Sequence, residues 1–114
     1  KKLSSHDRVY EAKRDLEAGA RYVIIEAREG GKSLGVYDET GALKEEMALF
    51  LAEEIGTENI MFEAPDKSQQ TRLVLLLGED VNLGNIRPED VIPLETLRRG
   101  IRSDTIGKMQ NRNR

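Results

Sequence analysis

Short aliphatic runs alternate with helix-like segments along the whole chain, and this alternation restricts the possible folds more than any other feature. Strands are expected at three places: residues 22–25, 59–62 and 81–86. The first run, Tyr-Val-Ile-Ile, has no polar alternation, which is typical of a strand buried on both faces. Strands separated by helices need crossover connections, so the order predicts βαβ units and a parallel sheet.

Glycine and proline mark the ends of the expected elements. Helices are expected at four places, each closed by a glycine: residues 4–19, 43–56, 66–78 and 94–100. Asp66 and Gln69 have the spacing of an N-cap residue and its N3 partner. Pro88 suits the first position of a single helical turn over residues 87–90, and the basic residues 108–114 are expected to form a solvated, frayed end.

Composition narrows the class of protein. The 114 residues, 38% hydrophobic and 34% charged, are typical of one soluble globular domain. Cysteine is absent, which excludes disulfides and thiolate chemistry and favours a cytoplasmic location. The apolar run at residues 73–77 is too short to cross a bilayer, and a net charge of −3 does not favour nucleic acid, so neither a membrane nor a nucleic acid is an expected partner.

Polar side chains accompany the ends of the predicted strands. Glu26 and Glu63 follow the first two runs directly, and Asn82 and Asn85 lie in the third. The carboxyl ends of parallel strands meet at one edge of a sheet, where α/β proteins bind their ligands. The sequence therefore predicts one polar site built from three strand ends.

Seven blocks of residues, taken in order, resemble the closing half of phosphosulfolactate synthase. They are residues 17–20 (EAGA), 23–29 (VIIEARE), 62–65 (FEAP), 67–70 (KSQQ), 81–86 (VNLGNI), 94–100 (LETLRRG) and 102–105 (RSDT). The resemblance covers nearly the whole chain, from residue 3 to residue 107.

The resemblance implies a (β/α)8 TIM barrel of which this chain holds the C-terminal βα units, strands six to eight. A whole barrel normally takes about 250 residues. Residues 1–114 are therefore expected to form one domain, the C-terminal part of the barrel, with strands one to five absent. By the same resemblance, the full protein is a carbon-sulfur lyase that adds sulfite to phosphoenolpyruvate with Mg²⁺, giving (2R)-phospho-3-sulfolactate for coenzyme M biosynthesis. The lysine associated with proton delivery is expected upstream, so the isolated chain is expected to be inactive.

Glu26 and Glu63 are the expected ligands of the metal. Mg²⁺ is commonly held by one or two carboxylates together with substrate oxygens and waters, and each glutamate ends a predicted strand. The alternative interpretation, that these carboxylates pair with a neighbouring arginine at the barrel rim, stays open.

Five residues are expected to bind the anionic substrates: Arg28, Lys32, Asn82, Gly84 and Asn85. The two basic residues lie in a glycine-rich loop, and an arginine offers a bidentate fork to an oxyanion. The backbone near Gly84 follows the last strand, where many TIM barrels bind phosphate. Both asparagines have an equally good structural interpretation, in which they satisfy backbone groups of the turn.

Two other functions stay open. The family includes plant heat-stress-associated proteins, so the chain is alternatively part of a non-catalytic relative. A fragment of this kind can also act as an assembly module. We expect either a homo-oligomer or an association with the missing half of the barrel.

Overall fold

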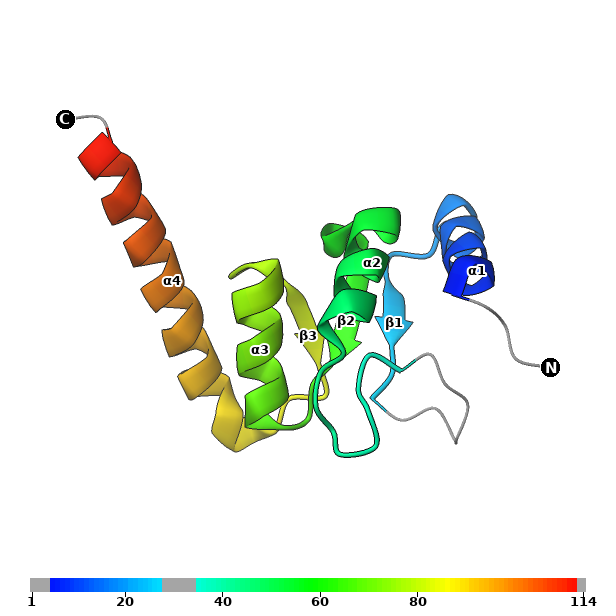
Figure 1. Cartoon of the computed structure of the whole chain (residues 1–114), viewed down its shortest axis with the longest axis horizontal. Coiled ribbons are helices and arrows are strands. Elements are labelled where there is room, and N and C mark those ends of the chain that lie inside the picture. Colours follow the sequence, from blue (N-terminus) through cyan, green and yellow to red (C-terminus); the bar gives the residue numbers. More distant parts are fainter. Residues whose placement is uncertain (1–4, 28–34, 113–114) are drawn as a thin grey trace.

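Three parallel strands lie at the centre of the molecule in the computed structural model, which describes the backbone of residues 5–27 and 35–112 and the side chains of residues 6–27 and 35–103. The elements follow in the order α1 (Ser5–Glu17), β1 (Val23–Ile25), α2 (Glu45–Ile55), β2 (Ile60–Glu63), α3 (Lys67–Leu77), β3 (Asn82–Gly84) and α4 (Val91–Arg112), with 3-10 turns at Thr57–Asn59 and Pro88–Asp90. β2 pairs with β1 and with β3, both in parallel, and the three arrows point the same way in Figure 1. The predicted α/β fold with parallel strands is confirmed.

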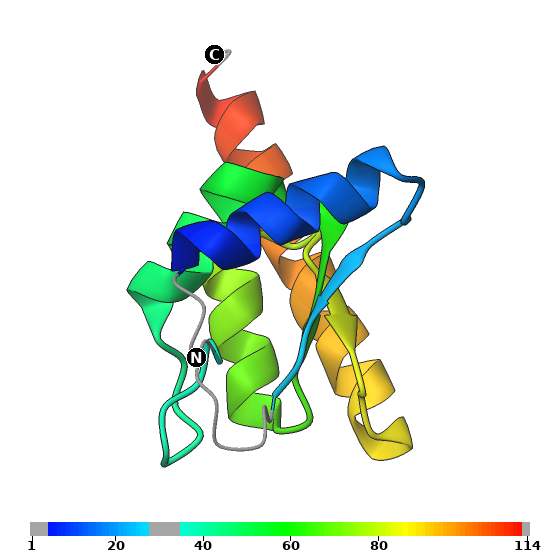
Figure 2. The same cartoon turned by 90° about the vertical axis from the view of Figure 1, so that its right-hand side faces the viewer.

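The helices α2 and α3 cover one face of the sheet (Figures 1 and 2). Ile60 and Phe62 of β2 are fully buried and belong to one hydrophobic cluster with Leu51 of α2 and Leu73 of α3. Val9 of α1 extends this cluster. Burial of each large aliphatic or aromatic side chain contributes about 1.5–3 kcal/mol, so this face holds the sheet and its helices together.

The other face of the sheet is open within the described residues. Ile24 points away from the covered face and is 58% exposed, and its partner in the register is Met61 of β2. The prediction that the first strand is buried on both faces is therefore wrong for this chain. Successive side chains of a strand alternate between faces, and helices cover only one of them here.

The last helix is much longer than predicted. α4 is continuous from Val91 to Arg112 and passes through both Pro93 and Gly100. Pro93 lies in the first turn, where a backbone N–H has no partner within the helix, and Gly100 costs a helix only about 1 kcal/mol. The predictions of a helix closed at Gly100 and of a tail frayed from residue 108 are thus wrong, although the last two residues lie outside the described part.

The third strand is shorter than predicted because of one residue. Asn85 has φ of 57°, in the left-handed region, so the extended run ends at Gly84. The single turn at Pro88–Asp90, with proline at its start, is confirmed. Among the described residues, no helix combines the length and the hydrophobicity needed to cross a membrane.

Candidate functional site

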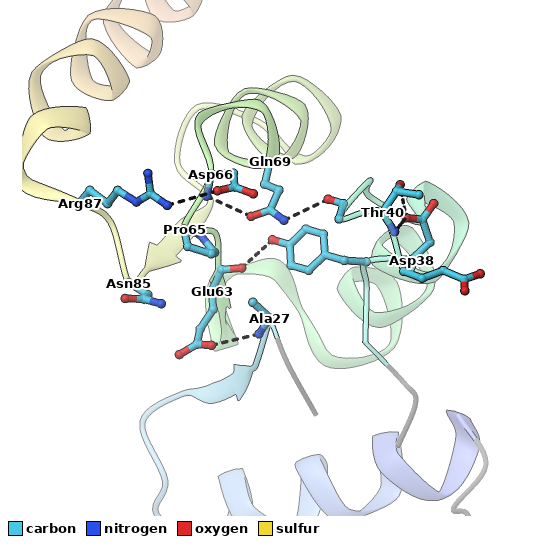
Figure 3. A pocket seen from close by; sticks show the side chains of 12 residues that line it. Ala27, Asp38, Thr40, Glu63, Pro65, Asp66, Gln69, Asn85 and Arg87 are labelled. Carbon is cyan, nitrogen blue, oxygen red and sulfur yellow. Dashed lines mark hydrogen bonds and ion pairs between the residues drawn. The ribbon is translucent and has the colours of Figure 1, made fainter. Parts of the chain in front are cut away.

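A pocket of about 700 Å³ lies at the carboxyl ends of the three strands and is lined by residues of the loops that follow them. The residues that line it are Ala27, Tyr37, Asp38, Glu39, Thr40, Gly41, Glu63, Pro65, Asp66, Gln69, Asn85 and Arg87 (Figure 3). They come from three loops and from the start of α3, so the parallel sheet brings together segments that are far apart in sequence. The pocket lies at the strand ends, where the sequence predicts a polar site, and it contains Glu63 and Asn85 of the four polar residues named for that site.

Glu63, the last residue of β2, fixes the floor of the pocket. Its carboxylate oxygen Oε1 accepts a hydrogen bond from the backbone N–H of Ala27, with an N–O distance of 3.0 Å. Its backbone oxygen accepts a hydrogen bond from the hydroxyl of Tyr37 at 2.5 Å. The register pairs Ile25 with Phe62, so one further step along both strands sets Glu26 beside Glu63. Glu63 therefore joins the end of β1 to the end of β2.

Tyr37 supports the opposite wall. It is buried, and it forms an antiparallel bridge with Leu43 that closes a small turn above the sheet. Burial raises the pKa of the Tyr37 hydroxyl, and the nearby negative charges of Glu63 and Asp66 raise it further. The phenol thus remains a hydrogen-bond donor throughout the physiological range of pH.

Asp38 organises the tip of this turn. Its carboxylate oxygen Oδ1 accepts hydrogen bonds from the hydroxyl of Thr40 (2.6 Å), the backbone N–H of Thr40 (2.8 Å) and the backbone N–H of Ala42 (3.1 Å). The Thr40 hydroxyl, followed by the two backbone N–H groups, lowers the pKa of Asp38, because each donor favours the charged carboxylate. Aspartate is suited to such turns because its side chain can bind the backbone two residues ahead.

The start of α3 forms a third wall. Asp66 and Gln69 make the predicted capping box, in which the backbone N–H of Asp66 donates to Oε1 of Gln69 at 3.1 Å. The same Gln69 side chain donates to the backbone oxygen of Gly41 at 3.0 Å, which ties the turn to the helix. Behind it, the buried Gln70 donates to the backbone oxygen of Ala64 at 2.9 Å. These contacts fix this wall of the pocket to helix α3.

Arg87 contributes the positive charge of the pocket. Four acidic side chains line the pocket: Asp38, Glu39, Glu63 and Asp66. Arg87 is the one basic residue among the lining residues that the structure describes, and its nitrogen Nη2 lies 3.5 Å from Oδ1 of Asp66. The described pocket therefore carries more negative than positive charge.

The structure brings together some of the predicted site residues and separates others. Glu63 and Asn85 line the pocket, whereas Glu26 is exposed beside it. Gly84 lies under Met61, since a Cβ atom added to it would lie 3.0 Å from the Met61 sulfur. Asn82 begins β3, and its amide donates to the backbone oxygen of Ile60 at 3.2 Å, away from the pocket.

Two predicted substrate-binding residues, Arg28 and Lys32, lie outside the described residues. Within the described part of the chain, no group of three or more His, Cys, Asp or Glu side chains is arranged to hold a metal ion. A metal at Glu26 and Glu63 would therefore need further ligands from substrate, water or residues elsewhere.

Sequence reasoning missed several residues of the pocket, chiefly Tyr37, Asp38, Asp66 and Arg87. For Arg87 a signal was present, because an arginine that follows a strand end and precedes a proline is held in extended backbone near the carboxyl edge. For Tyr37 we find no such signal, since its position depends on how the preceding loop folds back.

A parallel α/β sheet with a polar pocket at the carboxyl ends of its strands defines the class of this chain. The chain belongs to the phosphosulfolactate synthase family: the family model of (2R)-phospho-3-sulfolactate synthase (ComA) matches residues 1–104.

Curated relatives support this membership. The chain is 49% identical over 107 residues to the phosphosulfolactate synthase of Methanothermobacter thermautotrophicus. This match covers 94% of this chain and 42% of that protein. It is 50% identical over 109 residues to the enzyme of the same name from Methanocaldococcus jannaschii, covering 96% and 43%. A Bacillus subtilis phosphosulfolactate synthase is 42% identical over 92 residues, covering 80% and 36%. The chain thus spans about two fifths of the length of the first two relatives.

Proposed function

We propose that the full-length protein is a phosphosulfolactate synthase, and that this chain supplies βα units six to eight of its (β/α)8 barrel. Membership of the family is the observation that carries the proposal. The parallel strand order and the pocket at the carboxyl ends of the strands support it, because TIM-barrel enzymes place their active sites there. The proposed reaction is the Mg²⁺-dependent addition of sulfite to phosphoenolpyruvate, giving (2R)-phospho-3-sulfolactate.

The proposed reaction needs a site that handles several negative charges. The sulfur of hydrogen sulfite forms a bond to the terminal carbon of phosphoenolpyruvate while the carbon-carbon double bond breaks. The electron pair moves to the neighbouring carbon and its carboxylate, and that carbon then takes up one proton. A site for this reaction must stabilise an enolate-like charge and deliver a proton. We assign proton delivery to a residue outside this sequence.

Glu26 and Glu63 fit a magnesium ion that draws its remaining ligands from substrate and water. They occupy neighbouring positions at the ends of β1 and β2, and Mg²⁺ is usually held by one or two carboxylates. One oxygen of Glu63 is already bonded to the Ala27 N–H, which would orient the other oxygen toward a ligand. When bound, the ion would neutralise charge that develops on the substrate carboxylate.

The acidic lining of the pocket also supports a cation in the site. Two anionic substrates would be repelled by four carboxylates that face a single arginine. We therefore keep Arg28 and Lys32 as proposed anion-binding residues. Of the predicted residues near the end of β3, Asn85 is the better placed, because it lines the pocket and Gly84 does not.

The open face of the sheet supports closure by the rest of the barrel. Ile24 is a large apolar side chain on this face, and the outer edges of β1 and β3 have no strand partner among the described residues. An open apolar face and unpaired edges favour association with further strands. We propose that strands one to five of the full protein supply them, so that residues 1–114 are one part of a single barrel domain.

The test is to incubate the full-length protein with phosphoenolpyruvate, sulfite and Mg²⁺ and to follow product by phosphorus NMR and mass spectrometry. We expect a new phosphate ester whose mass equals that of phosphoenolpyruvate plus hydrogen sulfite, and no product when EDTA removes the metal. A folded protein that forms no such ester with both substrates and Mg²⁺ present would refute the proposal.

The two glutamates can be tested separately. Glu63→Gln and Glu26→Gln should each raise the Mg²⁺ concentration needed for half-maximal activity by roughly tenfold or more, since each removes a charged ligand. Glu53→Gln is the matched control, because Glu53 is an exposed glutamate on α2 outside the pocket lining. An unchanged Mg²⁺ dependence in the Glu63 and Glu26 variants would contradict their role as metal ligands.

A further inference from the structure

Arg87 is held in place by the backbone around it. It lies two residues after Asn85, whose left-handed conformation ends β3, and it directly precedes Pro88. A residue before proline is restricted to extended backbone, and Arg87 has φ of −65° and ψ of 144°. The guanidinium group is therefore presented from a short, stiff segment, and Figure 3 shows it pointing toward Asp66.

The ion pair between Arg87 and Asp66 is loose. Its N–O distance is 3.5 Å, and the two side chains are 59% and 55% exposed. Exposed pairs of this kind contribute little to stability, and a guanidinium group has five N–H donors of which such a pair uses few. Arg87 thus contributes little to stability at this position and retains N–H donors for another ligand.

Asp66 is fixed more firmly than Arg87. It is the N-cap of α3 and takes part in the capping box with Gln69. Because this box holds Asp66 in place, an anion that binds Arg87 has to compete with its carboxylate. An amide at position 66 would still cap the helix but would not compete, since asparagine is as good an N-cap as aspartate.

We infer that Arg87 is the side chain of the pocket that binds a tetrahedral oxyanion, the phosphoryl group or the sulfite of a small substrate, and that Asp66 weakens this binding by competing for it. This inference rests on the proposed function for the identity of the ligand but not for its chemical class. Arginine suits the role because its planar fork can make two parallel hydrogen bonds to such an anion. Nothing else described on the pocket wall carries a positive charge.

The test measures binding to the full-length protein by calorimetry, with Mg²⁺ held constant. Phosphoenolpyruvate and sulfite are titrated separately, so that the two sources of oxyanion are distinguished. Arg87→Gln should weaken binding of at least one of them about tenfold, because a charged hydrogen-bond donor is lost. Asp66→Asn should tighten binding of the same ligand about threefold.

Arg72→Gln is the matched control. Arg72 is also 59% exposed and also pairs with one carboxylate, that of Glu45, but it lies on α3 outside the pocket lining. It should leave both affinities unchanged. The melting temperatures of the Arg87 and Asp66 variants should stay close to that of the wild type, since both side chains are exposed.

The outcomes separate this inference from the proposed function. If the wild type binds phosphoenolpyruvate but forms no product, and Arg87→Gln loses that binding, the proposed reaction is wrong and the role of Arg87 stands. If the wild type forms product and Arg87→Gln binds both ligands as well as the wild type does, the role of Arg87 is wrong. Equal weakening by Arg87→Gln and Asp66→Asn would also overturn it, because a purely structural pair loses the same contact from either side.

Discussion

The two ends of the sheet use the same residue types in different ways. At the amino-terminal end, the side chain of Arg98 from α4 donates to the backbone oxygens of Glu79 (2.6 Å) and Val81 (2.8 Å). At the carboxyl end, Arg87 makes one loose ion pair at 3.5 Å and remains largely exposed. Arg98 therefore binds the backbone, whereas Arg87 faces the pocket.

The two asparagines near β3 differ in the same way. Asn82 donates its amide to the backbone oxygens of Ile60 (3.2 Å) and Glu58 (3.4 Å), so it joins β3 to the start of β2. Asn85, three residues later, is exposed at the pocket. The comparison teaches that, in this sheet, Arg98 and Asn82 bind backbone oxygens at the amino end, whereas Arg87 and Asn85 stay exposed at the carboxyl end.

Replacing Arg98 should have the largest effect on the free energy of unfolding. Arg98→Met keeps much of the apolar stem of the side chain but leaves two carbonyl groups without their charged donor, so we expect a loss of about 2–3 kcal/mol in the free energy of unfolding. Arg87→Met should cost less than about 0.5 kcal/mol, because its ion pair is exposed. Urea unfolding of the full-length variants measures both values, and equal losses would contradict the comparison.

The fold was largely predictable from the sequence. Uniformly aliphatic runs and glycine stops predict the order of strands and helices, because local propensity and the buried interior agree at these places. The errors lie where tertiary context decides. Ile24 faces outward because helices cover only one face, and α4 continues through Gly100 because a single glycine costs a helix little.

The site was predictable only in part. A strand end fixes where Glu63 lies, so the sequence predicts its place at the pocket. Asn82 and Asn85 have similar sequence surroundings, and only the backbone direction at each residue separates the structural side chain from the exposed one. Tyr37 depends on the path of a loop that returns over the sheet, which no local pattern specifies.

A pair of substitutions at the asparagines should have an intermediate effect. Asn82→Ala removes two hydrogen bonds to backbone oxygens and should lower the free energy of unfolding by about 1 kcal/mol. Asn85→Gly should change it by less than about 0.5 kcal/mol, because glycine adopts the left-handed φ of 57° without steric cost. Thermal unfolding of both full-length variants checks the difference. A larger loss at position 85 would reverse the assignment of structural and exposed roles.

Acid should produce the smallest effect, and the carboxyl end of the sheet offers a defined way to measure it. The hydrogen bonds that Arg98 and Asn82 donate at the amino end go to backbone oxygens and involve no carboxylate. The turn above the pocket instead depends on the carboxylate of Asp38, whose pKa lies below its ordinary value of 3.8. A lowered pKa means that this stabilisation is present above pH 3.8 and is lost as the pH falls through the value in the folded protein.

NMR of the amide protons of Thr40 and Ala42 can follow this loss, because both protons are bonded to the Asp38 carboxylate. We expect both signals to shift with one midpoint below pH 3.8, while the amide of Gly56, bonded to Ala52 ahead of β2 at the amino end, does not move with them. In Asp38→Asn the shift should disappear, since an amide does not titrate. A midpoint above 3.8 would mean that these hydrogen bonds do not stabilise the Asp38 carboxylate. A common shift of all three signals would mean that acid loosens the whole sheet rather than the pocket end. The two ends would then differ in geometry but not in their response to charge.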